Sequence, residues 1–329
     1  MGQQCVIGID GGGTRTRIVV ADLSGNVLSY AEHGASSIHK DANAARNVQE
    51  GIADALAKAG RTPEQAAGLL AGVAGFDSER DLAWVEELTA LPGIVCPRWH
   101  VNDAVIAHAG AFMSGPGIMV VSGTGSIIFA VTEDGAHLRN YDMHHYASSA
   151  ARFLAYEATY EILAGHTGPS DSALVRRTLD FWNKPDVEEL LRLALQGFAS
   201  DPKERTRLFG QMAPIVTSAA LEGSELARSV CDRKVHEAVV GVHMLGACFR
   251  SETVQVACIG SAINSTYMKE QFRKECESVS AKRYILQEPV LSPAAGAVMM
   301  ALNRLGVSAG DDTVDKLLKH PCSRGDSSL

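Results

Sequence analysis

The most restrictive feature of the sequence is one pattern that occurs twice, at residues 6–26 and again at 118–135. In each copy an apolar strand leads into a turn rich in glycine, a strand rich in β-branched residues follows, and a polar turn ends the unit. A strand that follows such a turn directly indicates a hairpin rather than a strand that enters a helix. The repeated hairpin therefore indicates two copies of one domain that face each other.

Strand and helix patterns also alternate outside the two hairpins. Apolar residues at helical spacing predict helices over 41–59 and 104–112, and short buried strands are predicted at 69–73 and 99–102. The second half is mainly helical between 150 and 249. This mixture predicts an α/β fold.

A chain of 329 residues exceeds one usual domain, so two domains are predicted. We place the first at 1–115 and the second at 116–306, the second being enlarged by a helical insertion. A closing helix of small residues is predicted at 293–305, and packing of this helix back onto the first domain is left open. A polar tail is predicted at 307–329.

An excess of acidic residues argues against a nucleic-acid partner or an anionic membrane surface, with 38 Asp and Glu against 30 Lys and Arg. No apolar run approaches the roughly 18 to 20 residues of a membrane span, and no basic stretch precedes an apolar segment at the start, so no signal peptide is predicted. The seven cysteines are scattered without a C-x-x-C pair, which favours free thiols in a reducing compartment. We therefore expect a cytoplasmic protein.

The glycine turns have a chemical use, because glycine lets backbone N–H groups approach a phosphate without a Cβ in the way. Two such turns, one from each domain copy, can hold one polyphosphate. No lysine of the chain is followed by serine or threonine, which excludes a P-loop. The glycines do not spell G-x-G-x-x-G and a hairpin follows the first turn, so a Rossmann site is disfavoured.

Two aspartates fit phosphoryl transfer. Asp10 ends the first strand directly before the glycines, where a carboxylate can hold Mg²⁺ beside the β- and γ-phosphates of a nucleotide. Asp103 ends another strand and opens a helix, where a base can take a proton from an attacking hydroxyl. The alternative for Asp103 is a plain helix N-cap, and it stays open at this point.

Five motifs in order resemble the N-acetylglucosamine kinase and BadF/BadG/BcrA/BcrD ATPase group, which belongs to the actin, Hsp70 and hexokinase superfamily. They are VIGIDGGGT at 6–14, NDA at 102–104, SGTGS at 122–126, CIGSA at 258–262 and SPAAGA at 292–297. The resemblance covers about residues 5 to 306. It implies two RNase H-like (actin-like ATPase) domains with a nucleotide cleft between them.

The resemblance also implies roles for single residues. Asp10 is expected to hold Mg²⁺, and Asp103 is expected to act as the catalytic base toward a sugar hydroxyl. Contacts to ATP are expected from the glycine and threonine residues of the motifs: Gly12, Gly13, Thr14, Gly123, Thr124, Gly125 and Gly260. Contacts to the sugar are assigned to Ser37, Asn102 and Ser122.

The segment after the second hairpin departs from the family pattern. Sugar kinases of the group carry Gly-Gly-Trp-Gly and then Gly-Asp-Glu-Gly-Ser there, whereas residues 139–150 are RNYDMHHYASSA. By register, Ala147 and Ser148 replace the Asp-Glu pair, and Ser37 lies near the position of a family asparagine. These positions help to hold the sugar in the kinases, so the departure leaves the acceptor open.

Three functions remain as hypotheses. The first is an ATP-dependent kinase that acts on an amino sugar, an N-acetylated sugar or a related small polyol. The second is a sensor of ATP or sugar whose acceptor site has decayed. The third is an ATPase that activates a CoA-dehydratase or reductase; such relatives carry a cysteine just before the second glycine turn, where this chain has MVVS at 119–122. A homodimer is a possible assembly that the sequence leaves open.

Overall fold

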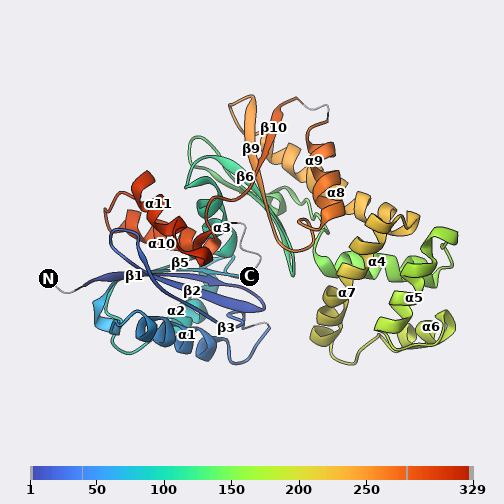
Figure 1. Ribbon diagram of the computed structural model, residues 1–329, viewed down its shortest axis with the longest axis horizontal. Helices are drawn as coiled ribbons and strands as arrows, with labels where there is room; N and C mark the ends of the chain where they lie inside the picture. The colour runs from blue at the N-terminus through green and yellow to red at the C-terminus, as the bar shows by residue number, and fades with distance from the viewer. Residues whose placement is uncertain (1–2, 39, 279–280, 326–329) are drawn as a thin grey trace. The chain divides into compact units, whose positions relative to one another are not determined.

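The chain folds into two compact α/β units in the computed structural model, which describes residues 3–38, 40–278 and 281–325 (Figure 1). The first unit consists of Met1–Met119 together with Gln287–Leu329, and the second is Val120–Leu286. Each unit is built on one five-stranded sheet. The prediction of an α/β fold with two related domains is therefore confirmed.

The first sheet is mixed and has the strand order β3-β2-β1-β4-β5. The central strand β1 pairs antiparallel with β2 and parallel with β4, while β4 also runs parallel to β5. The strands are β1 (Cys5–Gly11), β2 (Arg15–Asp22), β3 (Val27–Gly34), β4 (Ala66–Val73) and β5 (Arg98–Asn102). This pairing brings the carboxyl ends of β1, β4 and β5 to the same edge of the sheet.

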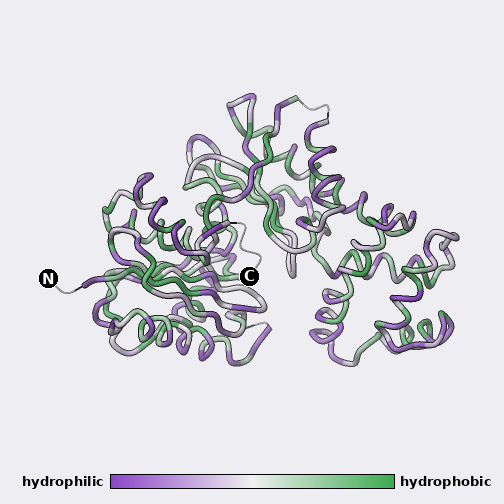
Figure 2. The backbone as a smooth tube through the Cα atoms, in the orientation of Figure 1, coloured by the Kyte–Doolittle hydropathy of each residue, from purple (hydrophilic) through white to green (hydrophobic). Residues whose placement is uncertain are grey.

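Helices cover both faces of this sheet, which explains why β1 is apolar along almost its whole length. In Figure 1 helices α1 and α2 lie on one side of the strands and α10 and α11 on the other, and Figure 2 shows the hydrophobic strands between them. These helices are α1 (Ala44–Lys58), α2 (Leu82–Leu88), α3 (Asp103–Phe112), α10 (Pro293–Arg304) and α11 (Asp311–Leu318).

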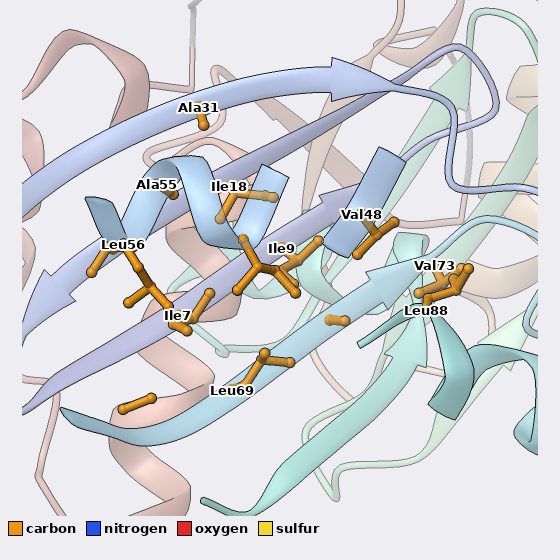
Figure 3. Packing of buried hydrophobic residues seen from close by; sticks show 14 of the residues in the cluster. Ile7, Ile9, Ile18, Ala31, Val48, Ala55, Leu56, Leu69, Val73 and Leu88 are labelled. Atoms are coloured by element: carbon orange, nitrogen blue, oxygen red, sulfur yellow. The ribbon is translucent and has the colours of Figure 1, made fainter. Parts of the chain in front are cut away.

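Successive residues of β1 point into two different cores. Ile7 and Ile9 pack with Leu69 of β4 and with Val48 of α1, as Figure 3 shows. Val6 belongs to the opposite core, which contains residues of α3 and α10. The strand thus joins both helical layers of the unit.

Glycines allow α10 to lie directly on β1 and α3. A Cβ at Gly8 of β1 would lie 2.4 Å from the backbone oxygen of Ala294, and one at Gly296 of α10 would lie 2.6 Å from the backbone nitrogen of Gly110. Real Cβ atoms do not approach other atoms so closely, so these positions accept only glycine without a shift of the backbone. The small-residue helix is therefore part of the core of the first unit.

The second sheet has the order β10-β9-β6-β7-β8, so its strands follow one another through the sheet as those of the first sheet do. Its first strand along the chain, β6, is central like β1, and each is followed by a glycine turn. The strands are β6 (Gly117–Ser122), β7 (Ser126–Val131), β8 (His137–Arg139), β9 (Thr253–Ile259) and β10 (Arg283–Gln287). The same strand order in both sheets supports the duplication that the repeated hairpin predicts.

Most of the second unit is helical, as the sequence predicts for 150–249. The core of the insertion contains Trp182, Leu190 and Phe209, with Tyr156 packed against it. The helices of the unit are α4 (Ala151–Leu163), α5 (Ser172–Phe181), α6 (Val187–Leu195), α7 (Pro202–Glu222), α8 (Glu225–Gly246) and α9 (Thr266–Cys276). Short 3-10 helices occur in both units, at Pro63–Gln65, Glu79–Asp81, Asn140–Met143, Pro169–Asp171 and Pro321–Ser323.

The domain boundaries differ from those predicted from the sequence. The structure assigns Gln287–Leu329 to the first unit, whereas the prediction places residues up to 306 in the second domain and the remainder in a polar tail. Within that supposed tail, α11 buries Leu317 fully and Val314 almost fully against the core that contains α10. The apolar residues of α11 recur at helical spacing, and this packing requires them.

Two further findings concern disulfide bonds and membrane-spanning helices. None of the seven cysteines, all of which lie among the described residues, forms a disulfide. Over the residues that the structure describes, no helix has the length and apolar character needed to cross a membrane.

Candidate functional site

The carboxyl ends of three parallel strands bring several acidic residues of the first unit to one edge of the sheet. Gly11 of β1 is level with Val73 of β4, which in turn is level with Asn102 of β5. The segments that follow these strands therefore begin side by side, and they carry the glycine turn, Asp77 and Asp103. Ligands of open α/β sheets bind at this kind of edge.

Asp10 lies just inside this edge. Its side chain is 13% exposed, and its Oδ2 accepts a hydrogen bond from Nη1 of Arg17 at 3.2 Å. Burial raises the pKa of Asp10, and the guanidinium of Arg17 partly offsets that rise. Low exposure disfavours the ionised form of this carboxyl, whereas the ion pair with Arg17 favours it, and the ionised form is the one that would hold a cation.

Asp103 is the first residue of α3 and lies near Asp10. Burial, followed by repulsion from Asp10, raises the pKa of Asp103 to about 7, and Asp77 adds to the repulsion. A carboxyl group with such a pKa exchanges its proton near neutral pH, as a general base must.

The N-cap of α3 is Asn102, not Asp103. Its Oδ1 accepts from the backbone N–H of Ala104 at 2.9 Å, and its Nδ2 donates to the carbonyl of Phe76 and to Oδ1 of Asp77. Oδ1 of Asp103 also lies 3.0 Å from the same N–H. The amide of Asn102 is thus engaged in capping α3 and in fixing the segment after β4, which argues against the sugar contact assigned to it from the sequence.

The first glycine turn, residues 12–14, joins β1 to β2. The backbone N–H of Gly12 donates to the carbonyl of Arg15, and the carbonyl of Gly12 accepts from the backbone and the hydroxyl of Ser36. A Cβ at Gly12 would lie 2.9 Å from the carbonyl oxygen of Arg15. Thr14 is exposed at the tip of the turn.

The second glycine turn is defined here as residues 122–126, between β6 and β7. The N–H of Gly123 donates to the carbonyl of Gly125, and both Thr124 and Gly125 are exposed. Gly260, which follows β9, lies against the start of this turn: a Cβ there would be 2.2 Å from the carbonyl oxygen of Ser122, and its φ is +113°. The structure therefore brings together four of the residues expected to bind nucleotide: Gly123, Thr124, Gly125 and Gly260.

Nothing within the protein requires glycine at positions 13 and 125. An added Cβ would meet only Cγ of Lys40 at 3.8 Å in the first case and nothing within 4 Å in the second. Neither residue has a positive φ. Space left open in this way on both turns is what a phosphate needs in order to reach backbone N–H groups.

Ser122 and Ser37 lie differently from the expectation of a sugar contact. Ser122 is fully buried, and its hydroxyl donates to the carbonyl of Ser149 at 2.6 Å, so the side chain fastens the turn to the following segment. Ser37 is 5% exposed and is the neighbour of Ser36, which contacts the first glycine turn. The burial of both serines argues against direct recognition of a sugar by their hydroxyls.

Arg17 and Ser36 are site residues that the sequence interpretation missed. Arg17 stands opposite Asp10 in the antiparallel pairing of β1 with β2, so the hairpin register alone could have indicated the ion pair. Ser36 gave no comparable signal, because its contact with Gly12 depends on where β3 ends.

Magnesium is the metal that the sequence predicts at Asp10. Among the residues with a described placement, no three His, Cys, Asp or Glu side chains gather into a metal site. Mg²⁺ is usually held by one or two carboxylates together with substrate phosphates and water. The buried carboxylate of Asp10 beside an open glycine turn fits that mode of binding.

Gly125 allows a direct test of the second glycine turn. We expect Gly125→Ala to leave the unfolding temperature unchanged or slightly higher, because alanine fits the backbone and restricts the unfolded chain. The affinity for ATP should fall by about tenfold, because the methyl group occupies the space left for phosphate. Calorimetric titration measures the affinity for ATP, and thermal unfolding of the same preparation measures the unfolding temperature. An alanine variant that binds ATP like the wild type would contradict the assignment of the turn.

A duplicated sheet, a glycine turn after the central strand of each copy, and paired carboxylates at one strand edge define an actin-like ATPase fold. The family model for the BadF/BadG/BcrA/BcrD ATPase family matches residues 7–301. The chain belongs to that family, whose name describes its members as ATPases.

The two curated proteins that this chain resembles are named as sugar kinases. An N-acetylmuramic acid/N-acetylglucosamine kinase from Clostridium acetobutylicum is 26% identical over 277 residues, which cover 82% of this chain and 89% of that protein. An N-acetyl-D-glucosamine kinase from Dictyostelium discoideum is 28% identical over 255 residues, covering 70% and 75%. A crystal structure from Chromobacterium violaceum, of a protein described as a candidate N-acetylglucosamine kinase, matches with a TM-score of 0.71 and 24% identity, covering 91% of this chain and 99% of that one.

Proposed function

We propose that this protein is an ATP-dependent kinase that phosphorylates a hydroxyl of a small sugar, with amino sugars and N-acetylated sugars as the first class of acceptor. The observation that carries the proposal is the pair of open glycine positions, Gly13 and Gly125, on turns after the two central strands. The names of the two curated relatives support the acceptor class.

In this proposal each glycine turn binds ATP through its phosphates, and Asp103 takes the proton of the attacking sugar hydroxyl. The raised pKa of Asp103 suits a base that must accept a proton near neutral pH. Asp10 would hold Mg²⁺, which neutralises charge on the phosphates when it is bound. Arg17 would keep Asp10 in place and contribute positive charge at the same edge.

The segment 139–150, which departs from the sugar-binding pattern of the family, gives a specific reason to keep the sensor hypothesis as a second candidate. Ala147 is 4% exposed, and both the N–H and the hydroxyl of Ser148 donate to Glu237. The two residues that replace the family's Asp-Glu pair are thus engaged within the protein. For the dehydratase-activating ATPase no observation of this kind exists, and the missing cysteine at 119–122 counts against it.

A panel of acceptors tests the proposal. We expect ADP release above the acceptor-free rate with at least one amino sugar, N-acetylated sugar or anhydrosugar, and equimolar sugar phosphate by mass spectrometry. The Asp103→Asn variant, assayed with the same sugars, controls for contaminating kinases. Tight binding of ATP without turnover of any acceptor would reject the kinase and favour the sensor.

Location in the cytoplasm and assembly as a homodimer are proposed only as expectations from the sequence. Sedimentation of the purified protein measures the second directly.

A further inference from the structure

A buried ion network joins helix α8 to the segment that follows β8. Lys234 of α8 has a side chain that is only 8% exposed, and its Nζ lies 3.1 Å from Oε1 of Glu237, 3.0 Å from Oε2 of Glu157 and 3.0 Å from Oγ of Ser148. A lysine is almost never buried unless it is paired in this way. The network therefore places a fixed charge cluster against Ser148.

Glu237 holds Ser148 by two hydrogen bonds at once. Its Oε2 accepts from the backbone N–H of Ser148 at 2.8 Å and from the hydroxyl at 2.7 Å. Burial opposes ionisation of this carboxyl, but the hydrogen bonds from Ser148 and the ammonium of Lys234 outweigh it and lower the pKa of Glu237. An ionised acceptor makes these bonds stronger than bonds between neutral groups.

The residues on either side of Ser148 are fastened to the second glycine turn. The carbonyl of Ala147 accepts from the hydroxyl of Ser126 at 2.9 Å, and the carbonyl of Ser149 accepts from the hydroxyl of Ser122 at 2.6 Å. These two serines are the last and the first residue of the turn. Ser148 is thus the middle of a segment that is bonded to both ends of the turn.

Two further hydrogen bonds, from Ala151 and Arg152, join the segment to the turn. The N–H of Ala151 donates to the carbonyl of Gly123 at 2.8 Å, and Nη1 of Arg152 donates to the carbonyl of Thr124 at 2.8 Å. The segment 147–152 therefore lies along the turn as a support. Ser148 within this segment is held by Glu237 and Lys234 of α8, a helix of 22 residues.

We propose that Glu237 and Lys234 are positioning residues that fix the second glycine turn, 122–126, through Ser148. The inference rests on the proposed function, because it assumes that this turn binds the phosphates of ATP. Neither side chain touches the nucleotide in this account. They keep the support segment in place, so that the N–H groups of the turn are already oriented when ATP arrives.

The experiment uses the full chain with substitutions at both ends of the contact. Glu237→Ala removes both bonds to Ser148 and leaves Lys234 with one carboxylate fewer, whereas Glu237→Gln keeps a carbonyl oxygen that can accept from Ser148. Ser148→Ala removes only the hydroxyl bond. The matched control is Glu161→Gln. Glu161 pairs with Arg233 at 3.6 Å, and Arg233 pairs with Glu157 of the network at 3.1 Å. This substitution removes one charge from the edge of the network and none of the hydrogen bonds described above for residues 147–152.

Two measurements are made on each variant. The first is the dissociation constant of ATP by calorimetry, which we expect to rise by about tenfold or more in Glu237→Ala, less in Glu237→Gln and Ser148→Ala, and not in Glu161→Gln. The second is hydrogen exchange of the ATP-free protein, in which the amides of 122–126 and 147–152 should exchange faster in the same order while those of the sheet core stay protected.

The outcomes separate this inference from the proposed function. A wild-type protein that does not bind ATP would reject the function, while the exchange order would still decide the positioning role. The inference would be overturned if Glu237→Gln and Ser148→Ala both bound ATP and exchanged the amides of 122–126 and 147–152 as the wild type does. These two variants also decide the question if Glu237→Ala fails to fold.

Discussion

Replacement of Asp103 with asparagine is expected to lower kcat for sugar phosphorylation by about 10²- to 10⁴-fold, the usual contribution of a positioned general base. The affinity for ATP should change little, because Asp103 is assigned to the acceptor hydroxyl and not to the phosphates. Asparagine preserves the shape of the side chain but cannot accept the proton. Steady-state kinetics and calorimetric titration of ATP measure the two parts separately.

The raised pKa adds a test that depends on pH. In the protein free of Mg²⁺ and nucleotide, the base form of Asp103 is lost as the pH falls through about 7. We therefore expect kcat/KM for ATP, which depends on the ionisation of the free enzyme, to decline toward acid from that point. Because the folded protein favours the protonated acid, the stability associated with Asp103 is present at low pH and is lost as the pH rises through about 7.

Asp103→Asn should therefore melt at a higher temperature than the wild type at about pH 8, and the two should converge in acid. A variant that keeps the wild-type rate would remove Asp103 from the mechanism. A variant that is equally stable at every pH would instead show that the carboxyl is not perturbed.

Replacement of Gly260 with alanine is expected to damage both stability and nucleotide binding. The backbone at φ +113° disfavours any side chain, which costs about 1–3 kcal/mol of the free energy of unfolding. The new Cβ would also lie 2.4 Å from the carbonyl carbon of Ser122 and 2.9 Å from the backbone nitrogen of Gly123. Both contacts are with the second glycine turn, so the turn must move.

The expected result is a lower midpoint of unfolding by urea together with an affinity for ATP weakened by about tenfold or more. Gly210→Ala is the matched control, because Gly210 lies inside α7 with nothing within 4 Å of an added Cβ. That change should raise stability by about 0.5–1 kcal/mol and leave ATP binding intact. If Gly260→Ala behaves like this control, Gly260 has no role in shaping the turn.

The parts of the site that could be predicted from the sequence are local in the chain. Asp10 and the glycines that follow it are consecutive, and a strand, a turn and a second strand within about twenty residues define their setting. The same holds for the turn 122–126. The position of Arg17 opposite Asp10 could have been predicted for the same reason, because hairpin register follows from turn length.

Asn102 and Asp103 show a limit of local reasoning. Both residues can cap a helix, and the choice between them depends on where the helix begins to within one residue. The structure gives the capping position to Asn102, whose amide also reaches Phe76 from another part of the chain. That second contact distinguishes the two residues, and no local pattern contains it.

Contacts between particular side chains of distant segments could not be predicted unless a family motif contained them. Ser148 and Glu237 are 89 residues apart, and no pattern in the sequence connects them. In the same way, the small residues of 293–305 predicted a helix, but not that its backbone would lie against Gly8 and Gly110. Such packing depends on how the sheet is assembled.

The discontinuous first unit has a consequence for the order of events during synthesis. The ribosome completes β1 first, but α10 covers one face of that strand and is made only after the whole second unit. Val6, Val19 and Leu70 therefore face water, or a chaperone, until the last tenth or so of the chain emerges. The first unit is the first to be synthesised, but it can complete its folding only after the second unit has been made.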